Sequence, residues 1–374
     1  MSVVDLVAAA RVLAARLPGL SAQHERDGAL DASVVAELAS AGLTACLLPP
    51  ELGGHALAPT AYIEVLATLA QADAATAWVT MTASTSTLLA PYLARAAAER
   101  IWATSPALLL AGVFAPTGTV TITGDRATVR GRWQFTSGCR HAAWIAVGAM
   151  SPGDGDPASR QHVVALVPAG ARGLTIADHW DVMGLRGTGS HDLVLDDVEV
   201  PADQIGSVFT AAPWATGPLV RFPLFGLLAT GIAACGLGIA AAALDHVAAS
   251  ARTAASGGGA LIADVGRLLT RLGAARAHLE ASAEAAMAGA RRGEVSGVER
   301  GRLRLAAWHA ASESLEVTRA AFALAGGGAI RAGHPVGRAL HDAEVMRSHR
   351  MIADKVVATA SRAALGLGPV PPDL

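Results

Sequence analysis

Residues 131–144 read Gly131-Arg-Trp-Gln-Phe-Thr-Ser-Gly-Cys-Arg-His-Ala-Ala-Trp144, and they carry the strongest structural signal in the chain. The first half is a β-type run that reaches Phe135, after which Ser137-Gly138 indicates a turn. Taken alone, the stretch is most simply a strand with an aromatic residue on its buried face, closed by a Ser-Gly turn at the end of a hairpin. The neighbouring sequence extends this β character.

The stretch lies within a longer region of strand signals. Its β-branched or alternating runs, separated by Gly, Asp and Pro, cover residues 120–123, 127–135, 144–148, 162–167 and 193–201. The β signal ends near Ile205, and a connection containing two prolines follows between Phe209 and Phe222.

Both flanks of this region are Ala- and Leu-rich with helical spacing. On the N-terminal side, Asp31 is a candidate cap and Gly42 a stop signal for a helix of about three turns. On the C-terminal side, helical patterns from Phe225 to Leu365 predict four or five antiparallel helices. The sequence therefore predicts an α+β fold with a helical domain at residues 1–111, a β domain at 112–208 and a helical bundle at 209–374.

Composition narrows the possible functions. The net charge of −2 and the absence of a dense Lys/Arg run argue against a nucleic-acid partner. With 52% hydrophobic and 16% charged residues, part of the surface is expected to be buried in a homotetramer or homodimer joined through the C-terminal helices. Three scattered cysteines without CxxC spacing favour a reducing cytoplasm, and the spacing of the histidines supports no metal site.

The uncharged run from Leu224 to Leu244 is long enough to cross a bilayer. Because it is rich in Ala and Gly and stands alone, we expect a buried core helix and no membrane association. The N-terminus carries Asp5, Arg11 and Arg16, which favour an amphipathic helix over a signal peptide.

Three segments, in order along the chain, resemble the acyl-CoA dehydrogenase superfamily, and more closely its branch of two-component flavin-dependent monooxygenases. They are Pro49-Pro-Glu-Leu-Gly-Gly with the helical segment 67–79, the stretch 131–144 quoted above, and Trp180-Asp-Val-Met-Gly-Leu-Arg-Gly-Thr-Gly-Ser-His-Asp-Leu-Val-Leu-Asp-Asp-Val-Glu-Val-Pro201. The third is similar to the family's strand pair that closes the β domain, in the Thr-Gly-Ser form typical of the monooxygenases.

The resemblance implies a fold and a cofactor. The fold is an N-terminal helical domain, a middle β-barrel or sandwich domain and a C-terminal four-helix bundle. The cofactor is a flavin, reduced FMN or FAD, with Phe135 against its ring and with Thr136 and Ser137 at its polar edge. Arg252 resembles an arginine that reaches a flavin phosphate across a subunit interface, with solvation at a helix end as the alternative. Gly327, in a Gly-rich turn, is assigned to cofactor binding in the same way.

The C-terminal segment departs from the dehydrogenases. His341-Asp342 stands where the family has Arg-Asp, and His349 and Arg350 follow where one major branch has its catalytic glutamate. Phe114-Ala115-Pro116 likewise replaces the dehydrogenase motif Thr-Glu-Pro. His349 matches the position of a histidine in the oxygenating relatives, so we expect it to be catalytic together with Ser137.

A neutral imidazole at His349 could take a substrate proton or hydrogen-bond a flavin hydroperoxide. The reaction rate is then expected to change with pH near the ordinary pKa of imidazole. The alternative is a surface histidine in a polar turn between Arg347 and Arg350.

The preferred hypothesis is a monooxygenase that uses reduced flavin and O2 to oxygenate a small apolar or aromatic molecule. The Gly clusters lack the strand-GxGxxG-helix context, so NAD(P)H binding is not expected and a separate flavin reductase would supply the electrons. The alternatives are a flavoprotein that desaturates an acyl thioester and a non-redox member of the fold. The candidate pocket residues are Trp78, Tyr92, Phe222, Phe225 and Met346, although such residues on helices are more often core. The substrate and the choice between FMN and FAD stay open.

Overall fold

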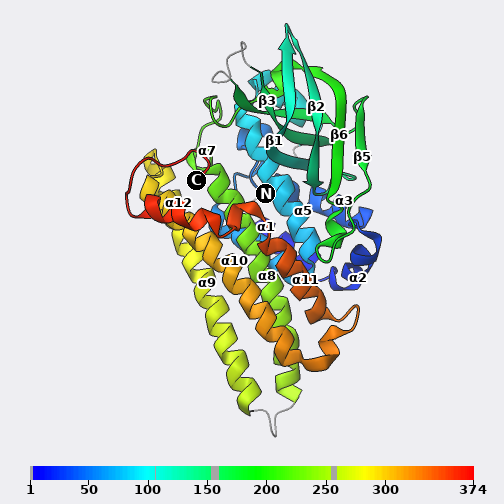
Figure 1. Ribbon diagram of the computed structural model, residues 1–374, viewed down its shortest axis with the longest axis vertical. Helices are drawn as coiled ribbons and strands as arrows, with labels where there is room; N and C mark the ends of the chain where they lie inside the picture. The colour runs from blue at the N-terminus through cyan, green and yellow to red at the C-terminus, as the bar shows by residue number, and fades with distance from the viewer. Residues whose placement is uncertain (1–2, 106, 153–159, 254–258) are drawn as a thin grey trace.

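The computed structural model describes residues 3–105, 107–152, 160–253 and 259–374, and it has a helical, a β and a second helical region in chain order (Figure 1). The N-terminal helices are α1 (Val3–Ala14), α2 (Pro18–Asp27), α3 (Ala32–Ser40), α4 (Pro59–Ala72), α5 (Ala74–Ser86) and α6 (Arg95–Trp102). The strands are β1 (Leu110–Thr123), β2 (Arg126–Thr136), β3 (Trp144–Ser151), β4 (Gln161–Pro168), β5 (Leu174–Ala177), β6 (His191–Pro201) and β7 (Ile205–Gly206). The C-terminal helices are α7 (Pro218–Arg221), α8 (Leu224–Thr253), α9 (Gly259–Arg292), α10 (Gly297–Ala325), α11 (Pro335–Arg347) and α12 (Lys355–Ala364).

The helix signals in the sequence are confirmed at α3. The Asp31 side chain accepts a hydrogen bond from Ser33 N at 2.8 Å, and Gly42 adopts a φ of +71° just beyond the helix end. A side-chain cap at this position satisfies a backbone donor that the helix leaves unpaired. Helix α5 begins in the same way, with Asp73 accepting from Thr76 N at 3.0 Å.

The β region forms a single seven-stranded sheet in the order β5-β6-β2-β1-β3-β4-β7. Strand β1 pairs with β3 in parallel, and the other neighbours are antiparallel. Trp133 is fully buried, and its indole Nε1 donates to Gly148 O at 2.7 Å. The predicted middle β domain is thus present as one seven-stranded sheet. The segment 180–201 contributes one strand, β6, and not a strand pair of its own.

The C-terminal bundle is built around α8, which packs against α4, α5, α10 and α11. Among the described residues, α8 is the one helix long and apolar enough to cross a membrane, but 83% of its most apolar window is buried within the protein. A Cβ atom at Gly238 would lie 2.4 Å from Ala67 O, and one at Gly231 would lie 2.8 Å from Met81 Cγ. The glycines therefore allow close helix contact, and α8 is a core helix, as expected.

Helix α5 lies where the three regions meet. It packs against β1 on one side and against α4 and α8 on the other, and nearly all of its residues are buried. Several of its buried hydroxyls donate to the preceding turn, such as Thr80 Oγ1 to Thr76 O at 2.8 Å and Thr85 Oγ1 to Met81 O at 2.8 Å, whereas Ser84 Oγ donates to Leu43 O at 3.1 Å. These bonds let a hydroxyl-rich helix be buried without unpaired groups.

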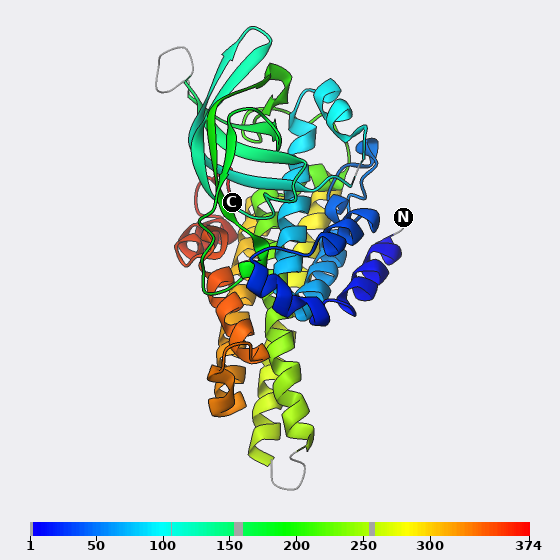
Figure 2. The same cartoon turned by 90° about the vertical axis from the view of Figure 1, so that its right-hand side faces the viewer.

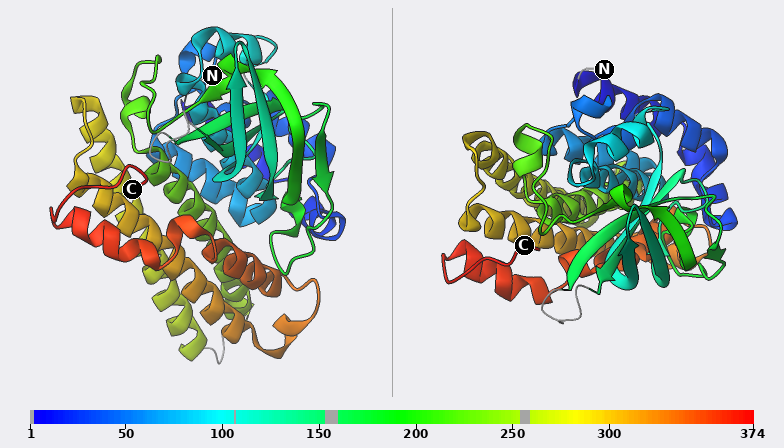
Figure 3. Two further views of the ribbon diagram at one scale, coloured as in Figure 1. Left: turned by 45° about the horizontal axis from the view of Figure 1, so that its top comes forward. Right: turned by 90° about the horizontal axis from the view of Figure 1, so that it is seen from above.

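The views from other sides show the same arrangement. The N-terminal helices cover one side of the bundle, and α11 and α12 lie on the opposite side (Figure 2). From above, the sheet covers one end of the helices (Figure 3). The predicted order of helical, β and helical regions is confirmed. The domain limits at residues 111/112 and 208/209 stay a prediction, and β1 begins two residues before the first of them, at Leu110.

Candidate functional site

Ser137 follows β2 and lies in a chain of hydroxyl groups between the sheet and α5. Its Oγ is 2.7 Å from Ser190 Oγ, which is 2.7 Å from Thr188 Oγ1. On the other side, Trp78 Nε1 on α5 donates to Ser137 Oγ at 3.1 Å. Strand and helix are therefore joined through one serine oxygen.

The direction of the protons along this chain follows from its ends. Thr188 Oγ1 donates to Leu185 O at 2.7 Å, so Ser190 donates to Thr188 and Ser137 donates to Ser190. A hydroxyl has one donor and two acceptor positions. Since Ser137 accepts only from Trp78, one lone pair of its oxygen is left for a ligand N–H or O–H group.

The turn after β2 depends on Gly138. Its φ is +72°, which favours glycine, and its N–H donates to Thr188 O at 2.9 Å. A Cβ atom there would lie 3.1 Å from Val79 Cγ1 of α5. The glycine thus lets the turn approach α5 closely.

Phe135 and Thr136, the last residues of β2, have opposite environments. Phe135 has a φ of +66°, is 64% exposed and contacts the ring of Trp180 edge-on at 6.2 Å. Met183 in the following segment is also exposed. Thr136 is fully buried, yet its Oγ1 has no hydrogen-bond partner in the described structure. An exposed aromatic surface beside an unsatisfied hydroxyl fits a flat, polar-edged ligand such as a flavin.

His349 is joined to Ser137 through Trp78. Its ring meets the indole of Trp78 edge-on, with 5.8 Å between ring centroids. The residue precedes η8 (Arg350–Ile352), and its Nδ1 accepts a hydrogen bond from Met351 N at 3.2 Å. Because Nδ1 is the acceptor, the neutral ring carries its proton on Nε2. His349 therefore presents an N–H donor at Nε2.

The surroundings of His349 keep its ring neutral. Burial, and after it the positive charges of Arg350 and Arg304, together lower its pKa from the ordinary 6.5 to about 4. This pKa lies below the ordinary imidazole value near which the sequence predicted a change of rate with pH. The alternative of a solvated surface histidine is wrong, because the ring packs on Trp78 and is only partly exposed.

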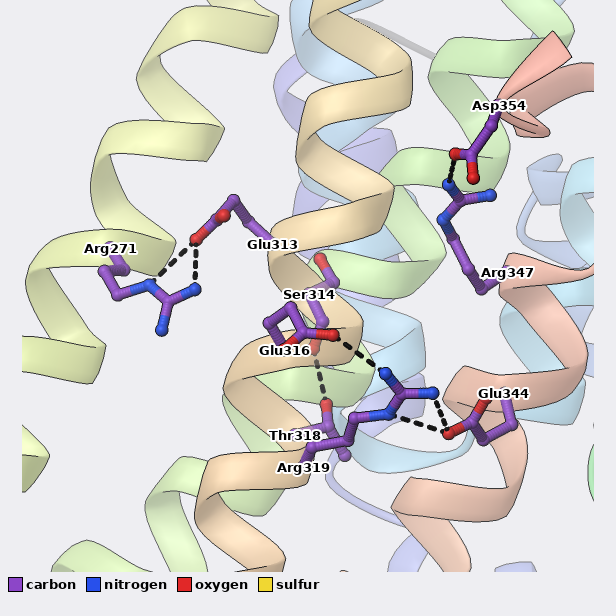
Figure 4. Close-up of polar contacts among 9 residues, drawn as sticks. All are labelled: Arg271, Glu313, Ser314, Glu316, Thr318, Arg319, Glu344, Arg347 and Asp354. Atoms are coloured by element: carbon purple, nitrogen blue, oxygen red, sulfur yellow. Dashed lines mark hydrogen bonds and ion pairs between the residues drawn. The ribbon is translucent and has the colours of Figure 1, made fainter.

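The segment that carries His349 is held by Arg347. Its guanidinium donates through Nη1 to Ile352 O at 2.8 Å and pairs through Nη2 with Asp354 (Figure 4). Asp354 also accepts from Trp308 Nε1 of α10 at 2.9 Å. Glu344, the carboxylate of α11 closest in sequence to Asp342, instead binds Arg319 of α10. These contacts leave no described carboxylate at the position of the dehydrogenase base.

The predicted pocket residues lie in several places. Tyr92 and Phe222 line a cavity of about 230 Å³ that is also bordered by Pro49, Leu88 and Met287. Trp78 lies between Ser137 and His349, as described above. The ring of Phe225 stacks on Phe209 with 5.7 Å between centroids.

Met346 is fully buried in the helical core, and its Cε lies 2.7 Å from where a Cβ atom of Gly236 would be. The five residues thus do not border one cavity.

Arg252 and Gly327 lie far from Ser137 within one chain. Arg252 is exposed near the C-terminal end of α8, and Gly327 is exposed in η7 (Gly326–Ile330). The C-terminal end of α8 and the segment η7 lie in the lower part of the bundle in Figure 1, whereas the sheet is at the top. The assignment of both residues to a flavin shared between subunits stays a prediction.

Asp342 lies in the C-terminal motif, where the sequence pattern does not mark it as a site residue. It is buried, and its Oδ1 accepts from Leu185 N at 2.6 Å, which joins α11 to η5 (Arg186–Thr188) and hence to the hydroxyl chain. Burial raises the pKa of this carboxyl to about 7.

Thr188 and Ser190 were missed in the same way, although the Thr-Gly-Ser motif contains them. The buried Arg304 had no motif that could have marked it. Within the described ranges, no group of three or more His, Cys, Asp or Glu side chains could hold a metal ion.

Comparison with known proteins identifies the family. The acyl-CoA dehydrogenase N-terminal, middle and C-terminal domain models match residues 6–102, 112–198 and 230–354. The chain belongs to the acyl-CoA dehydrogenase family. An indole-3-acetate monooxygenase from Pseudomonas putida is 31% identical over 358 residues, which cover 93% of this chain and 90% of the relative.

Two further proteins are similar over nearly their whole length. The oxygenase component of an FADH2-dependent resorcinol hydroxylase from Rhizobium sp. (strain MTP-10005) is 31% identical over 374 residues, covering 93% of this chain and 90% of the relative. The crystal structure of the HsaA monooxygenase from M. tuberculosis superposes with a TM-score of 0.91 at 26% identity, covering all of both chains. Two of these relatives are named as monooxygenases and one as a hydroxylase, and none of the three is named as a dehydrogenase.

The protonation of His349 can be measured directly. In protein with 13C-labelled histidine, the His349 ring signal, assigned by its loss in His349→Gln, should stay at its neutral position down to about pH 5 and titrate near pH 4. Because the folded pKa lies below the unfolded value, the contribution of this group to stability is complete above pH 6.5 and is lost as the pH falls toward 4. Titration near pH 6.5 would contradict the buried, neutral ring.

Proposed function

We propose that the chain is the oxygenase component of a two-component flavin-dependent monooxygenase. The observation that carries the proposal is the linked set of Ser137, Trp78 and His349, in which a neutral imidazole occupies the place of the dehydrogenase base. A desaturase needs a carboxylate there to remove a proton from the substrate. The nearby Glu344 and Asp354 are instead held by Arg319 and Arg347.

The flavin would be held by Ser137, Phe135 and Thr136. The free lone pair of Ser137 Oγ can accept from an N–H group, the exposed ring of Phe135 can cover an aromatic surface, and Thr136 Oγ1 lacks a partner. When bound in its reduced form, the flavin supplies the electrons that activate O2. The similar resorcinol hydroxylase component is named as FADH2-dependent, which supports reduced FAD, although FMN remains an alternative.

His349 would act as a hydrogen-bond donor. At neutral pH its Nε2 holds the proton and its Nδ1 is occupied by Met351 N–H, so the ring can donate to an oxygen atom at the reaction centre. Acting as a base through Nδ1 would require breaking that bond. Of the two roles that the sequence allowed, the structure favours donation.

The expected substrate is a small aromatic or apolar molecule, and the expected electron source is a separate flavin reductase. The relatives are named for indole-3-acetate and for resorcinol, both aromatic, and one is named as an oxygenase component. The proposed location is the cytoplasm, in keeping with three free, buried cysteines.

We also propose that the chain forms a homotetramer or homodimer through its C-terminal helices. Ile262 and Leu269 of α9 are 52% and 54% exposed, and Ile330 in η7 is 77% exposed. The chain exposes 15161 Å², whereas a compact monomer of this mass should expose about 14,000 Å². Such apolar exposure indicates an interface.

The replacement Ser137→Ala tests the flavin site. It removes one hydrogen-bond partner, so the Kd for reduced FAD or FMN, measured by anaerobic ultrafiltration, should rise by roughly three- to tenfold. Reoxidation of the bound flavin, followed by stopped-flow absorbance, should also change. The control is Ser40→Ala on the exposed end of α3. Equal affinities and equal reoxidation in both variants would remove Ser137 from the site.

The replacement His349→Ala tests the catalytic role. With indole-3-acetate or resorcinol as substrate, oxygenated product per unit time should fall by roughly 10²-fold while the flavin Kd stays unchanged. His349→Gln, which keeps an N–H donor, should recover part of the rate. His334→Ala is a matched control, because His334 also caps a helix through Nδ1, at Val336 N. Parental turnover in His349→Ala would refute the assignment.

The oligomer is tested by light scattering with the variant Ile262→Glu/Leu269→Glu. The parent should have the mass of two or four chains, and the charged variant should shift toward the mass of one because two carboxylates would be buried at the interface. A parent that is monomeric at micromolar concentration would contradict this proposal.

A further inference from the structure

Arg304 is a buried cation without a buried anion. This residue of α10 is 3% exposed, and none of the described carboxylates forms an ion pair with it. Its Nη1 donates to Phe225 O at 2.9 Å, whereas its Nε has no hydrogen-bond partner among the described residues. Burial lowers its pKa to about 10, so the guanidinium is still charged at neutral pH.

The guanidinium lies beside the proposed site. Phe225, whose carbonyl it binds, is at the start of α8 and stacks on Phe209. Helix α10, which carries Arg304, packs against η8, the turn that His349 caps. One turn beyond Arg304, the indole of Trp308 donates to Asp354, which follows η8 in the chain. Arg304 and His349 are close enough for the charge of one to disfavour protonation of the other.

Packing alone does not account for an arginine at this position. Burying an unpaired charge costs several kcal/mol, and an apolar side chain of similar volume avoids that cost. The C-terminal tail does not supply the missing partner through a direct contact. Its backbone at Pro372 O accepts from Arg300 Nη2 at 3.0 Å, and Asp373 acts on Arg304 only as a more distant charge.

The geometry of the free groups indicates what could bind. With Nη1 engaged by Phe225 O, the edge of the guanidinium that contains Nε and Nη2 makes no hydrogen bond to a described residue. Two parallel N–H groups on one edge match the two oxygens of a carboxylate. Phe225, whose backbone carbonyl accepts from Nη1, stacks its ring on that of Phe209, so this part of the fold also offers aromatic surface to the body of a ligand.

We propose that Arg304 is a specificity-determining residue that binds the carboxylate of an aromatic acid substrate in the site beside His349. This inference rests on the proposed oxygenase function and narrows its substrate class to aromatic carboxylates. The binding step transfers no atoms or electrons. It neutralises the guanidinium and orients the ring of the substrate relative to His349.

The test compares each acid with its uncharged amide. Binding of three pairs (benzoate and benzamide, phenylacetate and phenylacetamide, indole-3-acetate and indole-3-acetamide) is measured by calorimetry on the full chain with saturating oxidised FAD. We expect the parent to bind at least one acid tenfold or more tightly than its amide, and Arg304→Met to lose this preference. Arg304→Lys should retain part of it, because Lys keeps the charge but not the two-pronged edge.

The matched control is Arg300→Met, which removes the same charge one turn earlier on the same helix and should keep the parental preference. The thermal midpoint of Arg304→Met should be equal to or above that of the parent, since an unpaired buried charge is removed. A purely structural arginine would instead give a lower midpoint and no change in acid preference.

The inference is overturned if the parent prefers the acid in none of the three pairs, or if Arg304→Met keeps the preference. It is also overturned if Arg304→Met weakens only the binding of reduced flavin, which would assign the guanidinium to the cofactor. Binding is measured without turnover, so the two possible failures can be told apart. If the proposed function fails, no flavin-dependent product forms; if this inference fails, the preference for the acid is absent or does not depend on Arg304.

Discussion

The hydrogen bond from Trp78 Nε1 to Ser137 Oγ joins the regions on which the site depends. Trp78 lies on α5, which is buried between the sheet and the bundle, and Ser137 lies at the end of β2. The same indole contacts the ring of His349, which comes from the C-terminal region. One tryptophan thus sets the relative positions of a hydroxyl and an imidazole that are far apart in sequence. The buried, hydrogen-bonded hydroxyls of α5 give this tryptophan a rigid support.

Electrostatics gives the site its chemical character. Burial and two nearby arginines keep His349 neutral, and the backbone N–H of Met351 determines which ring nitrogen carries the proton. The carboxylates that could have changed this state are bound elsewhere: Asp354 by Arg347 and Trp308, and Glu344 by Arg319. A site with a neutral donor and an unpaired guanidinium suits an acceptor oxygen and an anionic ligand. It is unsuited to removing a proton from carbon, for which a carboxylate base is needed.

Much of the fold could be predicted, because its signals are local. Asp31 and Gly42 mark both ends of α3, and the β-branched runs mark the five long strands β1, β2, β3, β4 and β6. The Ala- and Gly-rich composition of Leu224 to Leu244 was correctly attributed to a buried helix, and Gly238 shows why: its missing side chain admits the backbone of α4. The error over residues 180–201 has a simple cause. The motif holds an irregular segment and one strand, β6, whose partner β5 is short and precedes the motif.

For the site, the sequence by itself determined which residue types were available: Ser137 after a strand, His349 in place of a glutamate, and no nucleotide-binding glycine motif. Only the tertiary structure decided how they act. The tautomer and lowered pKa of His349, the free lone pair of Ser137 and the unpaired charge of Arg304 depend on neighbours from other parts of the chain. Burial and hydrogen-bond direction arise from contacts between residues distant in sequence. Local patterns and spacing carry no information about them, because they form only when the helices and the sheet pack together.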